Sequence, residues 1–328
     1  MADAAGVLYG TSIAGGASDA GTVFSLAPPI SQGGPWVETT LHTFTGTAYA
    51  PSSDGANPTG TLAIDSEGVL YGTTEYGGSY GYGTAFSLTP PASPGEPWKE
   101  TIRHSFGNGS DGADPLAGLA IAGHGLLYGT TYGGGTSNLG TVFSLSRPAA
   151  PGGSWGETVL YSFRGDTQGF TDGEYPEYGA LVTGKGGVLY GITYAGGSSG
   201  VGTVFSLAPP SAPGGAWTEN VLYSFSFRHG QSPYGGLALG KGGILYGTTS
   251  EGGAGARNDA GTVFQLTPPK SQGQPWKYTN LFVFTDSNPN GQAPRAGVTL
   301  GKGVLYGTTS GQGLYANPSP GTVFQVTL

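Results

Sequence analysis

The chain has no cysteine, so it can form neither a disulfide framework nor a metal site with thiolate ligands. Charged residues make up only 10 % of its 328 residues, and only 12 residues are basic. Because these basic residues are scattered singly, the sequence offers no positive stripe, and we expect no nucleic-acid partner. The chain also contains no run of about 18 apolar residues, so we expect no membrane insertion.

Glycine and aromatic residues, by contrast, are abundant. Glycine accounts for 65 residues, and aromatic residues make up 12 % of the chain. Disordered chains of biased composition are poor in aromatic residues, since they have no core in which to bury them. The glycines are therefore interpreted as turns between ordered strands.

One unit recurs along almost the whole chain, and such self-similarity is typical of repeat architectures. Each copy contains Leu-Tyr-Gly and, about 12 residues after the tyrosine, Gly-Thr-Val-Phe or Gly-Thr-Ala-Phe. In five copies a proline-rich segment and a tryptophan follow, and then an alternating run and an X-Gly-X-X-Pro turn. The six tyrosines are Tyr9, Tyr71, Tyr128, Tyr190, Tyr246 and Tyr306, and the five tryptophans are Trp36, Trp98, Trp155, Trp217 and Trp276.

Each copy predicts four short strands. The segments are rich in β-branched and aromatic residues and are bounded by glycine, and none has a sustained 3.6-residue apolar period, so almost no helix is expected. In chain order the strands are a (Gly-Leu-Ala-Ile), b (Leu-Tyr-Gly-Thr), c (Gly-Thr-Val-Phe) and d (Trp to Phe), and four antiparallel strands at this period are typical of a propeller blade. We predict an all-β, six-bladed β-propeller as a single domain, residues 1–328, with approximate blades 1–57, 58–114, 115–175, 176–232, 233–293 and 294–328.

The strand pattern is incomplete at both ends. Strands b and c occur six times and strands a and d five times, so the first blade is expected to lack strand a and the last blade strand d. A chain trimmed at its N-terminus would explain this pattern. A five-bladed ring with leftover strands is the alternative, and self-association through unpaired edge strands is a third interpretation.

The repeated pattern resembles a known family. Gly-Val/Leu-Leu-Tyr-Gly-Thr-Thr, then Gly-Gly, then Gly-Thr-Val-Phe-Ser-Leu-Pro-Pro is similar to the GloVer (Gloeobacter–Verrucomicrobia) tandem repeat, from about residue 7 to 328. The resemblance implies exported bacterial proteins with propeller-like repeats, and it implies no established reaction and no catalytic residues. The chain is more weakly similar to NHL-type and senescence-marker-protein-type propellers, whose functions are too varied to transfer.

The same resemblance and the low charge favour an extracellular or cell-surface protein of a bacterium. Residues 1–5 lack the basic start and apolar stretch of a signal peptide, so we expect that an export signal has been removed and Met1 added. A cytoplasmic protein is the alternative.

Polar residues that recur in every copy are interpreted as parts of the blades. The first residue of each X-Gly-X-X-Pro turn is expected to form the turn rather than bind calcium, which needs six to eight converging oxygens. The glutamates two residues after the tryptophans are interpreted as part of a solvated strand face. The tryptophans are interpreted as side chains that cover the blade edge rather than as platforms for sugars, and the strand histidines as residues of an aromatic packing site. We expect no metal and no cofactor. The turn residues are Asp54, Asp111, Asp172, His229 and Asn290, the glutamates are Glu38, Glu100, Glu157 and Glu219, and the strand histidines are His42 and His104.

Residues that occur in one copy only are the candidates for function. Near the entry to strand a these are Thr59, Leu116, Glu177, Tyr178, Tyr234 and Arg295. A mixture of aromatic, acidic and basic side chains is typical of a small binding patch, so Glu177, Tyr178, Tyr234 and Arg295 are the predicted ligand-binding residues. A second candidate surface comprises the tyrosines of the b–c loops, Tyr76, Tyr80, Tyr82, Tyr132, Tyr194 and Tyr315.

Two functions are compatible with this pattern. The main hypothesis is an exported, non-catalytic propeller that binds a glycan or a protein partner or serves as a structural module. The alternative is a polysaccharide hydrolase or lyase, which needs at least two acid or base groups that converge in an axial cleft. Glu177 and Arg295 are the copy-specific charged candidates near the entry to strand a, and no catalytic residue is assigned.

Overall fold

The computed structural model describes the chain except residues 94, 151–152, 166–170, 213, 254–258, 272, 286–290 and 312–320, and it excludes the side chains of residues 124 and 259. In this described part, strands form six antiparallel blade sheets, and the helical elements are three 3₁₀ turns of three residues each, η1 (Gly123–Gly125), η2 (Lys185–Gly187) and η3 (Lys241–Gly243). These sheets are β-propeller blades, three in each of two compact units. The six-bladed, nearly helix-free prediction is confirmed, and the five-bladed alternative is wrong. No described helix is long and apolar enough to cross a bilayer.

The chain divides into two compact units, and the first is Met1–Ser162. It holds three blades and two short ribbons, β4–β7 and β10–β13. The blade strands are β1 (Leu8–Ser12), β2 (Thr22–Ala27) and β3 (Val37–Thr43), then β5 (Ala63–Ile64), β6 (Leu70–Thr74), β8 (Thr84–Thr89) and β9 (Lys99–Ser105), then β11 (Ala120–Ile121), β12 (Leu127–Thr131), β14 (Thr141–Ser146) and β15 (Gly156–Ser162). The ribbon strands are β4 (Gly55–Ala56), β7 (Tyr76–Gly77), β10 (Gly112–Ala113) and β13 (Gly133–Gly134).

The second unit is Phe163–Leu328, and it holds three further blades and the ribbon β16–β19. The blade strands are β17 (Val182–Thr183), β18 (Leu189–Thr193), β20 (Thr203–Ala208) and β21 (Thr218–Ser224), then β22 (Ala238–Leu239), β23 (Leu245–Thr249), β24 (Asp259–Thr267) and β25 (Lys277–Thr285), then β26 (Thr299–Leu300), β27 (Val304–Thr308) and β28 (Val323–Thr327). The ribbon strands are β16 (Gly173–Glu174) and β19 (Ala195–Gly196).

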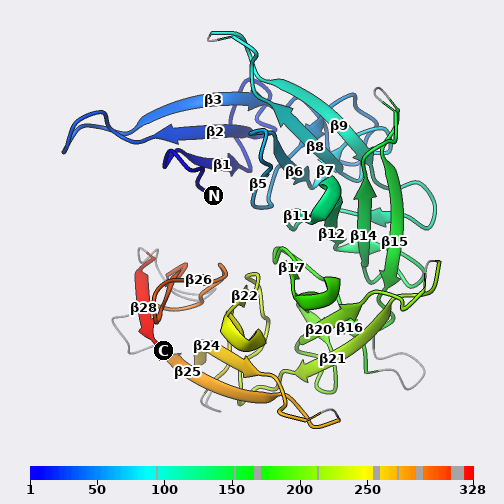
Figure 1. The fold of residues 1–328 in the computed structure, drawn as a ribbon, viewed down its shortest axis with the longest axis vertical. Coiled ribbons are helices and arrows are strands. Elements are labelled where there is room, and N and C mark those ends of the chain that lie inside the picture. The colour runs from blue at the N-terminus through cyan, green and yellow to red at the C-terminus, as the bar shows by residue number, and fades with distance from the viewer. Residues whose placement is uncertain are drawn as a thin grey trace. The chain divides into compact units, whose positions relative to one another are not determined.

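The order of strands within the sheets follows the predicted order. The four complete blades run a, b, c, d, as in β11-β12-β14-β15, whose strands lie side by side in Figure 1. The first blade lacks strand a and the last lacks strand d, also as predicted. In the first blade a single bridge between Ala2 and Leu8 occupies the place of strand a. Self-association through these edges remains a prediction.

The invariant Leu-Tyr-Gly and Gly-Thr-Val-Phe motifs pack against each other within one sheet. A Cβ added at Gly72 would lie 2.6 Å from the Cζ of Phe86, so only glycine leaves room for that ring. In all six copies a hydroxyl at the end of strand b forms a hydrogen bond with a hydroxyl at the start of strand c. Thr74 and Thr84, for example, lie 2.8 Å apart. The repeat motif therefore specifies the centre of each blade.

Phenylalanines connect each blade to the next inside a unit. Phe106, at the end of strand d, is fully buried and packs on Phe143 of the next blade with ring centroids 4.9 Å apart. Phe225 and Phe264 repeat this contact in the second unit at 5.2 Å. Such aromatic pairs add about 0.5–1.5 kcal/mol beyond the burial of their apolar area. Blade contact therefore rests on residues that every copy shares.

Candidate active site

The four predicted ligand-binding residues lie together in the second unit. The rings of Tyr178 and Tyr234 stack with centroids 4.8 Å apart and planes inclined by 20°, and the Arg295 guanidinium lies 5.5 Å above the Tyr234 ring. Tyr194 packs edge-on against Tyr234 at 5.9 Å. Glu177 is close enough for its charge to act on the Tyr234 hydroxyl. We call these five residues the tyrosine cluster.

Glycines next to the cluster residues determine how closely they approach. The segments that carry Glu177 and Tyr178, Tyr234, and Arg295 lead into the strand a of their blades, β17, β22 and β26, whereas Tyr194 directly follows β18. A Cβ on Gly235, which follows Tyr234, would lie 2.1 Å from the backbone nitrogen of Gly297, and a Cβ on Gly179 would lie 3.0 Å from the Cα of Gly236. The bare backbones can therefore pack in contact, and this contact brings the side chains of three successive blades within stacking distance.

The cluster shifts the acidity of two of its groups. Burial raises the pKa of Glu177 to about 7. Burial, with further contributions from Tyr178 and Glu177, also raises the pKa of Tyr234, against a smaller opposing effect of Arg295. At neutral pH, Tyr234 is thus a protonated hydroxyl, whereas Glu177 can exchange its proton. A titratable group poised near the working pH suits acid–base chemistry.

The cluster contains one carboxyl group. The raised pKa of Glu177 is due to burial, without a contribution from a second acid. Among the described residues, none donates a hydrogen bond to Glu177, and none forms an ion pair with Arg295. The described residues also contain no group of three His, Asp or Glu side chains that could hold a metal ion.

The other copy-specific residues have different surroundings. In the first unit, Thr59 donates a hydrogen bond from its hydroxyl to the carbonyl of Leu116 at 2.9 Å, which joins two blade entries without charged or aromatic groups. Of the loop tyrosines, Tyr194 joins the tyrosine cluster, although the sequence pattern did not group it with Tyr234. Its place in a tyrosine-rich b–c loop was the available signal. Tyr315 lies outside the described residues.

The remaining loop tyrosines form a surface in the first unit. Tyr76 packs against Tyr49 at 4.7 Å, and their hydroxyls lie 3.1 Å apart. Tyr80 and Tyr82 are exposed. Burial and a hydrogen bond with Tyr49 raise the pKa of Tyr76, and Glu75 raises it further through a hydrogen bond and its charge, so this surface also places a carboxyl group beside a tyrosine.

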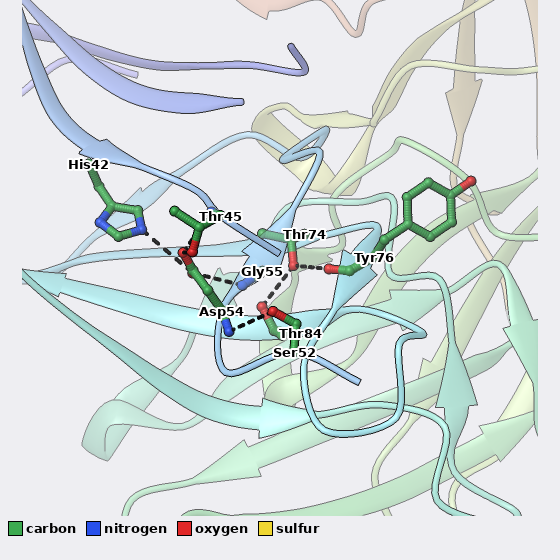
Figure 2. Close-up of polar contacts among 8 residues, drawn as sticks. All are labelled: His42, Thr45, Ser52, Asp54, Gly55, Thr74, Tyr76 and Thr84. Carbon is green, nitrogen blue, oxygen red and sulfur yellow. Dashed lines mark hydrogen bonds and ion pairs between the residues drawn. The ribbon is translucent and has the colours of Figure 1, made fainter. Parts of the chain in front are cut away.

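The turn aspartates form their turns, as predicted. Asp54 accepts hydrogen bonds from the backbone N–H of Gly55 at 2.7 Å and from the N–H of Thr45 at 2.8 Å, and His42 lies 3.6 Å away (Figure 2). Asp111 and Asp172 accept the equivalent bond from the glycine that follows each of them. Asn290 lies outside the described residues.

The strand glutamates correct one prediction. Glu38 is exposed, but Glu100, Glu157 and Glu219 are half-buried, and each has a buried Oε1 with no hydrogen-bond partner. A solvated strand face is therefore wrong for these three, because each packs near the turn aspartate of the preceding copy. Burial, followed by the charge of that aspartate, raises their pKa values to about 7, 7 and 8. We call Asp54–Glu100, Asp111–Glu157 and Asp172–Glu219 the acid pairs.

The strand histidines also do more than pack. His104 packs edge-on against Phe106 at 4.7 Å, as the prediction of aromatic packing requires. Its Nε2 also lies 2.8 Å from Asp111. In the fourth copy His229 replaces the turn aspartate, in the fifth copy Tyr278 replaces the glutamate, and the Tyr278 hydroxyl donates a hydrogen bond to the His229 carbonyl. Both members of an acid pair, the turn aspartate and the strand glutamate, are thus replaced together.

Several solved structures share this fold at low sequence identity. A PQQ-bound aldose sugar dehydrogenase from Streptomyces coelicolor is 15 % identical, with a TM-score of 0.52 and 98 % of each chain covered. An ulvan lyase of polysaccharide lyase family PL25 is 11 % identical, with a TM-score of 0.51 over 99 % of this chain and 91 % of the lyase. A protein of unknown function from Dyadobacter fermentans is 10 % identical, with a TM-score of 0.50 over 96 % and 86 %. At these low sequence identities, the similarity to the three structures shows a shared fold and nothing more.

The comparisons nevertheless contradict the main functional prediction. Among the structures just described, those with a stated activity are a sugar dehydrogenase and a polysaccharide lyase, so a non-catalytic module has no support among them. No curated protein matches the sequence. The Gloeobacter/Verrucomicrobia repeat matches residues 1–205 and 158–328, which together span the chain. The chain therefore belongs to the Gloeobacter/Verrucomicrobia repeat family.

Proposed function

We propose that the protein is a polysaccharide lyase that cleaves a uronate-containing polysaccharide by β-elimination at the tyrosine cluster. The observation that carries this proposal is the set of groups at one place: an arginine without an ion-pair partner among the described residues, a buried glutamate with a pKa near 7, and a tyrosine held protonated. β-Elimination next to a carboxylate needs a cation that binds the carboxylate, a base that removes the proton and an acid that protonates the departing oxygen.

The cluster favours elimination over hydrolysis. Glycoside hydrolysis in most families uses two carboxyl groups that flank the scissile bond. The cluster has one carboxyl, and the pKa of Glu177 is raised by burial rather than by a neighbouring acid. Elimination can use one carboxylate as the base and a tyrosine as the acid.

Each group has a definite part in the reaction. The Arg295 guanidinium binds the uronate carboxylate and withdraws charge from C5, which acidifies the C5 proton. Glu177 removes that proton, the C–H electrons form the C4–C5 double bond, and the bond from C4 to the glycosidic oxygen breaks. Tyr234 donates its hydroxyl proton to the departing oxygen, and the proton on Glu177 returns through solvent to restore the starting state. Tyr178 stacks on Tyr234 and holds its ring in place.

A panel of polysaccharides tests this proposal. Acidic polymers such as pectin, alginate, hyaluronan and ulvan are incubated with the protein beside neutral dextran, and both ultraviolet absorbance and new reducing ends are measured. Elimination produces an unsaturated uronate that absorbs, so the two signals should rise together on at least one acidic polymer. Reducing ends without absorbance, or no absorbance from any acidic polymer, would contradict the proposal.

We also propose an extracellular or cell-surface location. Intact polysaccharides of this kind meet an enzyme outside the cell, and the family name points to bacteria. Charged residues are scarce at 10 %, and cysteine is absent. Detection of the natural protein in the cell-free or surface fraction of its bacterium tests the location.

A further inference from the structure

A polar pocket of about 670 Å³ lies in the first unit, between the outer strands β9 and β15. Hydroxyl and amide side chains line much of it, and Trp155 forms part of its wall. Hydroxyls, amides and one aromatic ring are the groups that sugars contact in proteins, since a sugar presents both hydroxyls and an apolar face. The polar lining includes Ser79, Ser105, Asn108, Ser110, Ser154 and Thr158.

Arg103, which lines this pocket, differs from its counterparts in the other copies. The same strand position holds leucine in the four other repeats, and three of those leucines pack against the hydrophobic core. The pairing of strand c with strand d shifts at this point in all five copies, and in β9 the shift between Ala85 and Phe86 makes Arg103 the extra residue of the β-bulge. Bulges re-aim side chains, often next to functional sites. The second blade therefore gives up an apolar contact in favour of a charge at the pocket. The four leucines are Leu41, Leu160, Leu222 and Leu281.

The Arg103 guanidinium is held in place but not neutralised. Its Nε donates a hydrogen bond to the Ser87 hydroxyl at 2.8 Å, and it lies 5.5 Å from the centre of the Trp155 ring. Burial lowers the pKa of Arg103 and the charge of Arg147 adds to this effect, whereas Tyr71 and Glu100 act in the opposite direction. No described residue forms an ion pair with Arg103. A half-buried guanidinium that forms no ion pair within the described residues gains from an anionic ligand.

A second arginine, Arg147, also contacts the Trp155 wall. Arg147 occurs in one copy only and lies 5.9 Å from the Trp155 ring, where it pairs with Asp65 at 2.7 Å. Because that pair satisfies Arg147, Arg103 is the guanidinium left for a ligand. Both guanidinium groups therefore contact the Trp155 ring.

The acidic groups of the pocket do not neutralise Arg103. Asp111 is already engaged by His104 at 2.8 Å. The pKa of Glu157 is raised by burial and by Asp111 and lowered only by His104, so Arg103 does not pair with it. The Oε1 of Glu157 is buried and has no hydrogen-bond partner among the described residues.

We propose that this pocket binds one anionic sugar residue of a polysaccharide, with Arg103 contacting its carboxylate or sulfate group and the pocket hydroxyls contacting its sugar hydroxyls. The site would be a second, non-catalytic carbohydrate site in the first unit. It is independent of cleavage at the tyrosine cluster in the second unit, so it holds whether or not the chain is a lyase.

Binding measurements with one variant test the proposal. Arg103→Leu installs the residue that the four other repeats carry, so it should fold, and an unchanged thermal melting curve verifies this. Isothermal titration uses a Glu177→Gln background, in which turnover is removed, with four probes: a hyaluronan oligosaccharide, a chondroitin sulfate oligosaccharide, a neutral gluco-oligosaccharide and inorganic sulfate. Arg103→Leu should weaken binding of at least one acidic oligosaccharide about tenfold or more, as expected for loss of a charged hydrogen bond.

The matched control is Arg295→Leu, which should leave this binding component intact. The two acidic oligosaccharides distinguish a carboxylate from a sulfate as the anion. The proposal is overturned if Arg103→Leu binds the acidic oligosaccharides as well as the parent does, or if the neutral oligosaccharide binds equally well. Inorganic sulfate that binds as tightly as the oligosaccharides would also overturn it, because the pocket would then recognise the anion and not the sugar.

Discussion

Glu177 and Glu219 lie in the same unit and have pKa values raised by burial to about 7 and about 8, yet their surroundings differ. Glu219 belongs to an acid pair and faces Asp172, as Glu157 faces Asp111 in the first unit. Glu177 occurs once and belongs to the tyrosine cluster, with three tyrosines and an arginine. A raised pKa by itself therefore does not identify a catalytic acid, and the neighbouring groups decide what the proton can do.

The largest expected effect is a difference in the rate of elimination between variants of these two glutamates. Glu177→Gln removes the proposed base and should lower the rate of elimination by about 10²- to 10⁴-fold, the usual contribution of a general base. Glu219→Gln is the matched control in the same unit, and its rate should stay close to that of the unchanged protein. Equal losses in both variants would show that the location of Glu177 has no special role.

A smaller effect is expected at the glycine contact that assembles the tyrosine cluster. In Gly235→Ala the new Cβ would meet the backbone of Ala296 and Gly297 at 2.2 and 2.1 Å, so the two blade entries must move apart. We expect a loss of about 1–3 kcal/mol in the free energy of unfolding, typical of overpacking, together with reduced elimination. Urea unfolding and the absorbance assay measure both.

The control for this change is Gly123→Ala. Gly123 has no atom within 4 Å of an added Cβ and does not require a positive φ. That variant should leave stability and activity nearly unchanged. If Gly235→Ala behaves like Gly123→Ala, the close approach of the two backbones does not position the cluster.

The smallest effect concerns the acid pairs and pH. The pKa of Glu219 is about 8 in the folded protein and 4.5 in the reference state, so the folded state binds its proton more tightly. The resulting stability is complete below pH 4.5 and is lost as the pH rises towards 8. Since Glu219 is partly exposed and solvent screens its interactions, we expect a contribution of about 1 kcal/mol.

Glu219→Gln cannot lose a proton, so it should match the unchanged protein near pH 5 and exceed its stability near pH 8. Thermal or urea unfolding at the two pH values measures the difference. Tyr278→Phe, at the equivalent strand position of the next copy, should show no such dependence, because a phenylalanine brings no group that titrates in this range. A gain at pH 5 as large as that at pH 8 would contradict the assignment of the shift to Glu219.

Much of the fold and of the tyrosine cluster could be predicted from the sequence, because the six copies of the repeat can be aligned with one another. Motifs present in every copy specify the blades, and Tyr178, Tyr234, Glu177 and Arg295 stand out as exceptions to that pattern. The burial of Glu157 and Glu219 could not be predicted, since it depends on the turn aspartate of the preceding copy, about 46 residues earlier in both pairs. Arg103 is not among the residues that the sequence predicts for a site, although leucine occupies its position in the four other copies, because its role depends on the contact with Trp155, about 50 residues later.

The pH dependence of elimination tests the central claim most directly. If Glu177 is the base, kcat/KM on the cleaved polysaccharide should rise about tenfold per pH unit below pH 7 and level off above it, since only the carboxylate form accepts the C5 proton. The same profile should persist in Glu219→Gln. A rate that is flat from pH 5 to pH 8, or a profile that Glu177→Gln leaves unchanged, would contradict the account.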